Sequence, residues 1–242
     1  MSRVGDRARL EARVAKKSFR TASGQSVLVL ADLSFALEEG ETGALIGPSG
    51  CGKSTLMRIL AGLDRDFDGS VHRPEQGRVG MVFQEPRLLP WRSVEDNVRL
   101  AAPHASEAEI ASLFDALGLS EHRTHFPGEL SIGLARRAAL ARAFAVRPTL
   151  LLLDEPFVSL DAPLARQLQR DLAKLVESRR MITVLVTHDV DEAIALADRI
   201  FVLSARPAHV TGEIRVKGPR AVLSGEERGA VAARIEALRT AG

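Results

Sequence analysis

Nine consecutive residues have the types that are needed to wrap a triphosphate: Gly47, Pro48, Ser49, Gly50, Cys51, Gly52, Lys53, Ser54 and Thr55. They fit the pattern G-x-x-x-x-G-K-[ST], with an apolar strand-like segment before it and a helical pattern after it. Glycines let a loop turn its N–H groups inward around phosphate oxygens. Lys53 can then reach the β- and γ-phosphates, and Ser54 can offer its hydroxyl to Mg²⁺. We therefore predict a nucleotide-binding loop.

Four polar residues follow other apolar, strand-like segments: Gln84, Asp154, Glu155 and His188. Ligands bind at the carboxyl ends of strands in open α/β sheets, so we expect these residues to converge on the loop. Asp154 can hold Mg²⁺ through its water shell, Gln84 can join that shell, and Glu155 can polarise the attacking water. His188 can contact the γ-phosphate. Singly, such carboxylates often cap helices and a lone histidine is often structural, but together with the loop they favour nucleotide hydrolysis.

Two further residues near the loop each have two interpretations. Phe19 precedes the loop in a chain without tyrosine, so it is a candidate platform for an adenine ring, or else a core residue at a strand end. Cys51 lies within the loop, where a helix N-terminus and Lys53 favour a reactive thiol, but a packing role is the simpler interpretation.

Composition excludes several classes of protein. The 242 residues carry 33 basic and 31 acidic side chains, so charge gives no case for a nucleic-acid partner. A single cysteine excludes an intrachain disulfide framework and suits a reducing compartment. No apolar run approaches the roughly 18 residues of a membrane span. We expect a cytosolic chain that reaches a membrane only through a partner.

Hydrophobic periodicity predicts an α/β fold, a mostly parallel sheet with helices on both faces. Strand patterns at 11–17 and 26–37 indicate an antiparallel β subdomain, and segments near 69–73 and 78–83 are also strand-like. Ser93 and Ser106 are expected helix caps, and a third helix is expected over 132–146. Alternating strands and helices follow, with strands at 149–153, 182–186 and 199–203 and helices at 162–178 and 190–197. We predict one domain over 1–242: a core at 11–86 and 148–215, a helical insertion at about 87–147 and a tail at 216–242 with an amphipathic helix over 225–238.

These motifs, in this order and spacing, resemble the ATP-binding subunit of ABC transporters from about residue 11 to 210. The loop at 47–55 matches Walker A, Gln84 the Q-loop, 130–134 the signature, 150–155 Walker B, 159–161 the D-loop and His188 the switch histidine. Segments 86–91 and 205–207 are similar to the branch that imports nitrate, sulfonates, taurine and similar solutes. The resemblance implies a P-loop NTPase core, ATP and Mg²⁺ as ligands, and ATP hydrolysis coupled to import.

The resemblance also implies partners. Two copies, most simply a homodimer, would bind ATP head to tail, each ATP meeting Ser131 and Gly133 of the other copy at a helix N-terminus. A separate membrane permease would dock near residues 85–100, placing the chain at the cytoplasmic face of the inner membrane, with an extracytoplasmic solute-binding protein acting indirectly. Trp91 is a candidate permease contact, or else a core residue.

One departure from the family pattern affects the signature. The family sequence is Leu-Ser-Gly-Gly-Gln, whereas this chain has isoleucine at 132 and leucine at 134. Ile132 restricts the backbone and adds bulk where phosphate approaches, so we expect slower hydrolysis than from an intact signature.

Three alternative functions compete with this assignment. A heterodimeric transporter would pair this signature with a degenerate partner. A non-transport ABC ATPase of translation or DNA repair usually has tandem units or long coiled coils, which this chain lacks. A GTPase switch would carry an Asn-Lys-x-Asp motif, which is absent, and a small-molecule kinase needs no signature together with His188.

Overall fold

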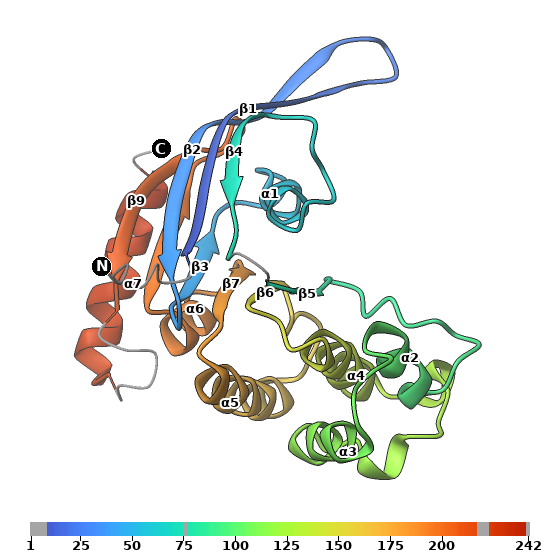
Figure 1. Cartoon of the computed structure of the whole chain (residues 1–242). Helices are drawn as coiled ribbons and strands as arrows, with labels where there is room; N and C mark the ends of the chain where they lie inside the picture. Colours follow the sequence, from blue (N-terminus) through green and yellow to red (C-terminus); the bar gives the residue numbers. More distant parts are fainter. Residues whose placement is uncertain (1–8, 75–76, 217–222, 241–242) are drawn as a thin grey trace, which may run out of the picture. The chain divides into compact units, whose positions relative to one another are not determined.

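The computed structural model describes residues 9–74, 77–216 and 223–240. The chain forms two compact units (Figure 1). The first joins Met1–Glu75 to Ile182–Gly242, and the second is Gln76–Met181.

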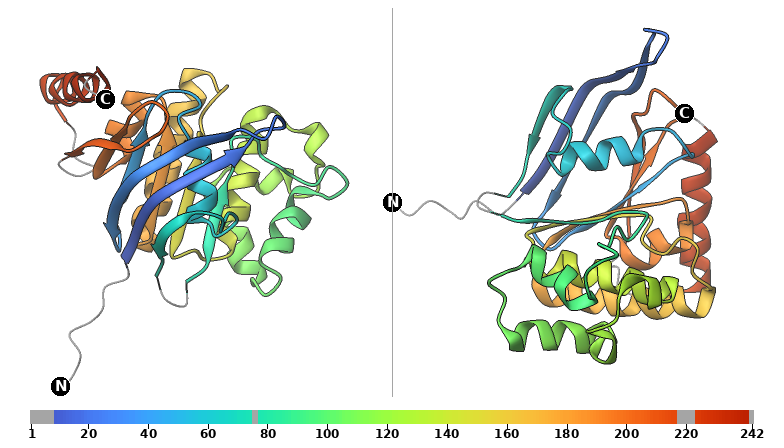
Figure 2. Two further views of the ribbon diagram at one scale, coloured as in Figure 1. Left: turned by 90° about the horizontal axis from the view of Figure 1, so that it is seen from above. Right: turned by 90° about the vertical axis from the view of Figure 1, so that its right-hand side faces the viewer.

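An antiparallel sheet opens the first unit. Its strand order is β2-β1-β4, with β1 at Arg9–Arg20, β2 at Ser26–Glu38 and β4 at Asp68–His72. A tight turn over 21–25 joins β1 to β2, and Figure 2 shows these two long strands side by side. The predicted antiparallel β subdomain is confirmed.

The strand that leads into the phosphate loop lies at the centre of a second set of strands in this unit. β3 (Thr42–Ile46) pairs in parallel with β7 (Ile182–Thr187) on one side and with β8 (Arg199–Leu203) on the other. β9 (Val210–Arg215) adds antiparallel to β8. All five residues of β3 and all six of β7 are buried, as expected for strands that are apolar throughout.

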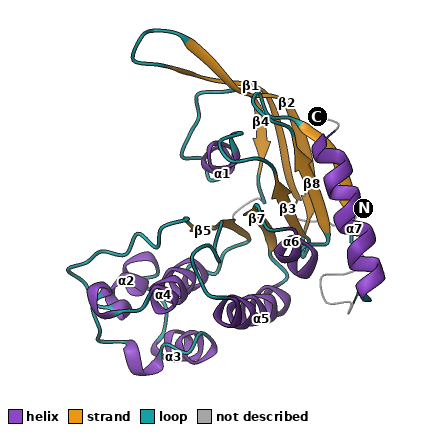
Figure 3. Ribbon diagram, turned by 180° about the vertical axis from the view of Figure 1, so that it is seen from behind, coloured by secondary structure: helices purple, strands orange, loops and turns teal. Residues whose placement is uncertain are grey.

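Two helices cover one face of β3 and β8. Side chains alternate along a strand, so Ala44 and Ile46 point to the same face, where they join one apolar cluster with residues of α6 (Val190–Leu196) and α7 (Gly225–Thr240). Figure 3 shows both helices beside these strands. Ile235 of α7 is fully buried in this cluster, so the C-terminal helix is part of the core.

The second unit contains the helical region and a pair of parallel strands. β5 (Val79–Val82) pairs with β6 (Leu150–Asp154), and α4 (Ile132–Ala145) and α5 (Ala162–Arg179) are its longest helices. An ion pair of 2.9 Å joins Arg137 of α4 to Asp171 of α5.

Shorter helices begin at the predicted serine caps. The Ser93 hydroxyl accepts a hydrogen bond from the Asp96 N–H at the start of α2 (Val94–Ala101). Ser106 and Glu109 form a capping box at the start of α3 (Glu107–Ala116), which satisfies two otherwise unpaired N–H groups. Two 3-10 turns, η1 (Ser120–His122) and η2 (Pro127–Glu129), lead to α4.

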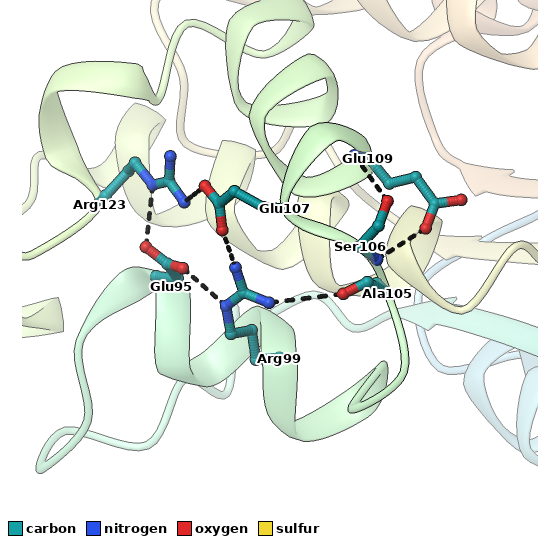
Figure 4. A network of polar contacts seen from close by, with 7 residues as sticks. All are labelled: Glu95, Arg99, Ala105, Ser106, Glu107, Glu109 and Arg123. Carbon is teal, nitrogen blue, oxygen red and sulfur yellow. Dashed lines mark hydrogen bonds and ion pairs between the residues drawn. The ribbon is translucent and has the colours of Figure 1, made fainter.

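A four-membered ion-pair network ties these short helices together (Figure 4). Glu95 of α2 accepts hydrogen bonds from Arg99 at 2.6 Å and from Arg123 at 2.8 Å, and Glu107 of α3 pairs with both arginines. The hydrogen bond from Arg123, together with that from Arg99, lowers the pKa of Glu95 despite its partial burial. The network therefore links α2, α3 and the segment that leads to the signature.

The two aromatic side chains for which the sequence left a core role open are exposed. Trp91 is 71% exposed and Phe19 is 44% exposed, so the core interpretation of each is wrong. Within the described residues, no helix is both long and apolar enough to cross a membrane.

We predict that Glu95→Gln destabilises the protein by about 1 kcal/mol near neutral pH, the upper range for partly exposed pairs. Because the folded-state pKa of Glu95 is lowered, its contribution is full above the unfolded-state pKa of about 4.3 and is lost as pH falls through the folded value. Urea unfolding at neutral and acid pH measures both effects. The control is Glu121→Gln at an exposed position. An equal deficit at both pH values would contradict the electrostatic origin.

Candidate functional site

The phosphate loop directly follows β3 and ends in α1 (Lys53–Leu60). The Lys53 ammonium is held by the loop itself, since Nζ donates to the Gly47 carbonyl at 2.8 Å and to the Pro48 carbonyl at 2.9 Å. The residue is only 6% exposed. Within the described part of the chain, the hydrogen bonds of this buried ammonium go to neutral carbonyls, an arrangement that suits an anionic ligand.

Two glycines of the phosphate loop leave no room for a side chain, because neighbouring strands lie too close. A Cβ on Gly47 would lie 2.9 Å from the Leu203 Cβ of β8. Gly52, which precedes α1, has a φ of 128°, and its Cβ would lie 2.8 Å from Leu30 and 2.9 Å from Val29 of β2. Cys51 is buried near Gly47, in agreement with a packing role. The loop is therefore fixed between β8 and β2.

His188 lies at the strand end next to this loop. In the β3–β7 register, Ile46 pairs with Thr187, so the residues that follow them, Gly47 and His188, leave adjacent strand ends. The Thr187 hydroxyl accepts from the Asp189 N–H at 3.0 Å, and the Asp189 carboxylate caps α6. His188 is exposed. The structure thus brings two of the predicted groups together.

Two arginines that were not predicted as site residues contact this site from the C-terminal part of the chain. Arg206 donates to the Gly50 carbonyl of the phosphate loop. Arg239 of α7 donates to the His188 carbonyl at 3.2 Å. Both lie far from their partners in sequence, so only the strand order could have indicated these contacts.

Phe19 lies near the end of β1 with its ring partly exposed. Lys17 Nζ is 4.6 Å from the ring centroid, a cation–π distance. The ring is accessible, and its stacking on adenine stays a prediction.

Gln84, Asp154 and Glu155 are together in the second unit. Val82 pairs with Leu153, so the residues that follow β5 and β6 leave adjacent strand ends. Asp154 is 6% exposed at the end of β6. Glu155 has a φ of 47° and Ser159 a φ of 65°, values that cost a non-glycine residue about 1–3 kcal/mol and cluster at functional sites.

The signature residues form the start of α4. The Ser131 hydroxyl caps this helix by accepting a hydrogen bond from the Leu134 N–H at 3.3 Å. Gly133 is buried, and a Cβ there would lie 2.5 Å from Leu164 of α5. Ile132 is 60% exposed. Its bulk therefore points to solvent at the N-terminus of the helix.

Arginines of α4 hold the segment that follows β5. Arg136 Nη1 donates to the Gln84 carbonyl at 2.9 Å. Arg142 donates to the Pro86 carbonyl at 2.8 Å and to the Arg87 carbonyl at 2.7 Å. Charged residues on an otherwise apolar helix were the available sequence signal, and it was missed.

Comparison with known proteins agrees with this arrangement. The family model described as ABC transporter matches residues 30–158. An aliphatic sulfonates import ATP-binding protein, SsuB 2 of Pseudomonas syringae pv. tomato, is 46% identical over 208 residues, covering 86% of this chain and 87% of the relative. The SsuB 2 of Burkholderia cenocepacia is 44% identical over 215 residues, covering 86% and 78%.

A solved structure is similar in fold. The ATP-binding cassette MJ0796, as a dimer in a post-hydrolysis state bound to ADP and Pi, matches with a TM-score of 0.75 and 27% identity, covering 86% of this chain and 99% of that one. The predicted P-loop NTPase fold is confirmed. With the loop, the strand-end residues and these relatives together, the chain belongs to the ABC transporter family as an ATP-binding, ATP-hydrolysing member.

Proposed function

We propose that this chain is the ATPase subunit of an importer for aliphatic sulfonates, working through a separate membrane permease. The observation that carries the proposal is 46% identity over most of both chains with a protein named for aliphatic sulfonate import. The relatives reported above name neither nitrate nor taurine, two other solutes of the predicted branch. An extracytoplasmic solute-binding protein would deliver the sulfonate.

In the proposed reaction, Lys53 and the N–H groups of the loop bind the β- and γ-phosphates of ATP. Glu155 polarises the attacking water, and His188 contacts the γ-phosphate. Phe19 stacks on the adenine. The position of Lys53 supports this assignment, because its ammonium is held in the phosphate loop by the Gly47 and Pro48 carbonyls.

The proposed metal ligands suit Mg²⁺. Ser54, Gln84 and Asp154 offer a hydroxyl, an amide oxygen and a carboxylate, which are the hard oxygen donors that this ion prefers. Magnesium would neutralise charge that develops on the phosphate oxygens. Asp154 is buried at a strand end, a position that restricts its side chain.

A second copy would complete each ATP site. Ser131 and Gly133 begin α4, and the helix N-terminus favours the negative γ-phosphate of ATP held by the other copy. The dimeric MJ0796 structures support this proposal. The altered signature is also compatible with a heterodimer, in which a second, complementary ATPase subunit replaces the second copy.

The proposed permease contact lies on the segment 85–100. Trp91 is 71% exposed and Leu100 is 57% exposed, which suits docking of an apolar helix from a membrane partner. The chain would then sit at the cytoplasmic face of the inner membrane, held there by the permease.

Transport tests the proposed solute. A permease and a solute-binding protein encoded beside this chain, co-purified with it and reconstituted in vesicles, should take up ethanesulfonate when ATP is supplied. Glu155→Gln in the same complex is the matched negative control. Uptake of nitrate without ethanesulfonate would contradict the assigned solute.

Two variants should separate the residue needed for ATP binding from the residue needed for ATP hydrolysis. Lys53→Ala should weaken ATP binding by about ten- to a hundred-fold, the value of a charge-assisted contact. Glu155→Gln should bind ATP normally, lose about 10²-fold or more in hydrolysis, and accumulate ATP-bound dimers. Fluorescent-nucleotide titration, phosphate release and sedimentation measure these effects. Lys16→Ala, at an exposed position, is the control. Normal hydrolysis by Glu155→Gln would remove Glu155 from the mechanism.

The signature departure gives a gain-of-function test. Restoring the family residues with Ile132→Gly and Leu134→Gln should raise ATP turnover of the assembled complex about fivefold, on the order of 1 kcal/mol in the barrier. Leu63→Gln, at another exposed apolar residue, controls for reduced surface hydrophobicity. An unchanged turnover would show that Ile132 and Leu134 do not limit hydrolysis.

A further inference from the structure

Arg136 is a buried charge that the proposed mechanism does not use. It lies in α4 and is only 5% exposed, among buried positions that are otherwise glycine, alanine, leucine and phenylalanine. Burying a guanidinium costs several kcal/mol unless nearby groups compensate. A buried arginine in such surroundings therefore needs a specific cause.

Its hydrogen bond leads to a candidate site residue of the second unit. Nη1 donates to the Gln84 carbonyl at 2.9 Å. Burial lowers the pKa of Arg136, and the charge of Glu155 partly offsets that effect. Nε is buried and has no hydrogen-bond partner within the described part of the chain. The guanidinium is thus only partly satisfied, and its hydrogen bond goes to the main chain of Gln84.

The same helix holds the rest of this segment. Arg142, further along α4, donates to the carbonyls of Pro86 and Arg87. Arg87 has a φ of 48°, and its guanidinium lies 4.3 Å from the ring centroid of Phe83. Three hydrogen bonds from α4 therefore fix the path of residues 84–87.

We propose that Arg136 is a positioning residue for ATP hydrolysis, which orients the Gln84 main chain from the helix that carries the signature. The inference rests on the role proposed above for Gln84. The hydrogen bond from Arg136 to the Gln84 carbonyl fixes the main chain of Gln84 and thereby the direction in which the Gln84 side chain leaves it. Arg136 itself does not touch ATP in this scheme.

The test compares Arg136→Gln with Arg136→Lys in the full chain. Arg136→Gln shortens the side chain and removes the guanidinium that donates to the Gln84 carbonyl, and because it also removes a buried ion, folding should persist. We expect its kcat to fall about tenfold to a hundredfold, as for a misplaced catalytic group, with KM for ATP within about threefold. Arg136→Lys keeps a longer side chain with a terminal donor and should recover at least half of that loss on a logarithmic scale.

The matched control is Arg137→Gln, which removes the next arginine of α4, paired with Asp171 on α5. It should lower the melting temperature without changing kcat per folded molecule. The proposal is overturned if Arg136→Gln keeps wild-type kcat, if KM rises alone, or if Arg136→Lys is as slow as Arg136→Gln.

Glu155→Gln, measured alongside, separates this inference from the proposed function. If Glu155→Gln hydrolyses ATP normally, the proposed role of Glu155 fails, whereas the role of Arg136 is decided by the kcat of its own variants. If Glu155→Gln is inactive and Arg136→Gln is not, only the role of Arg136 fails.

Discussion

Parallel pairing around β3 is the constraint on which the phosphate loop depends. Its two neighbours, β7 and β8, fix both where β3 ends and what surrounds the loop that follows. The register with β7 places Gly47 beside the turn of His188, and the close approach of Leu203 in β8 requires glycine at position 47. Because α6 and α7 bury the apolar face of β3 and β8, the loop is supported by a core that extends to the C-terminal helix. Its geometry is thus preorganised by packing far from the phosphates.

Arginines of α4 stabilise the second unit. Arg137 joins α4 to α5, while Arg136 and Arg142 hold the carbonyls of residues 84–87. Arginine suits this task because its planar, fixed donors reach several carbonyls at once and stay charged when buried. The helix that begins with Ser131 therefore also fixes the segment of Gln84. A displacement of one would be transmitted to the other through hydrogen bonds rather than through apolar contacts alone.

Local signals predicted the secondary structure well, whereas contacts distant in sequence were not predictable. The serine caps at 93 and 106 and the apolar strand at 149–153 depend on neighbouring residues, so their patterns were sufficient. The contact of Arg206 with Gly50 depends on which strand lies beside β3, which a single sequence does not state. Trp91 and Phe19 were ambiguous because exposure of an aromatic residue is decided by its surroundings. The roles of the candidate residues came from motif and resemblance, and remain predictions.

The altered signature is best understood from the geometry of the helix start. Ser131 and Gly133 have local tasks in this chain, since Ser131 caps α4 and Gly133 leaves room for Leu164. Ile132 has no such constraint from the core, because it is 60% exposed. The fold therefore tolerates isoleucine there, and its consequence is confined to whatever approaches the helix N-terminus. In a head-to-tail dimer that neighbour would be the nucleotide of the second copy, so the substitution would act on hydrolysis while leaving the stability of its own unit unchanged.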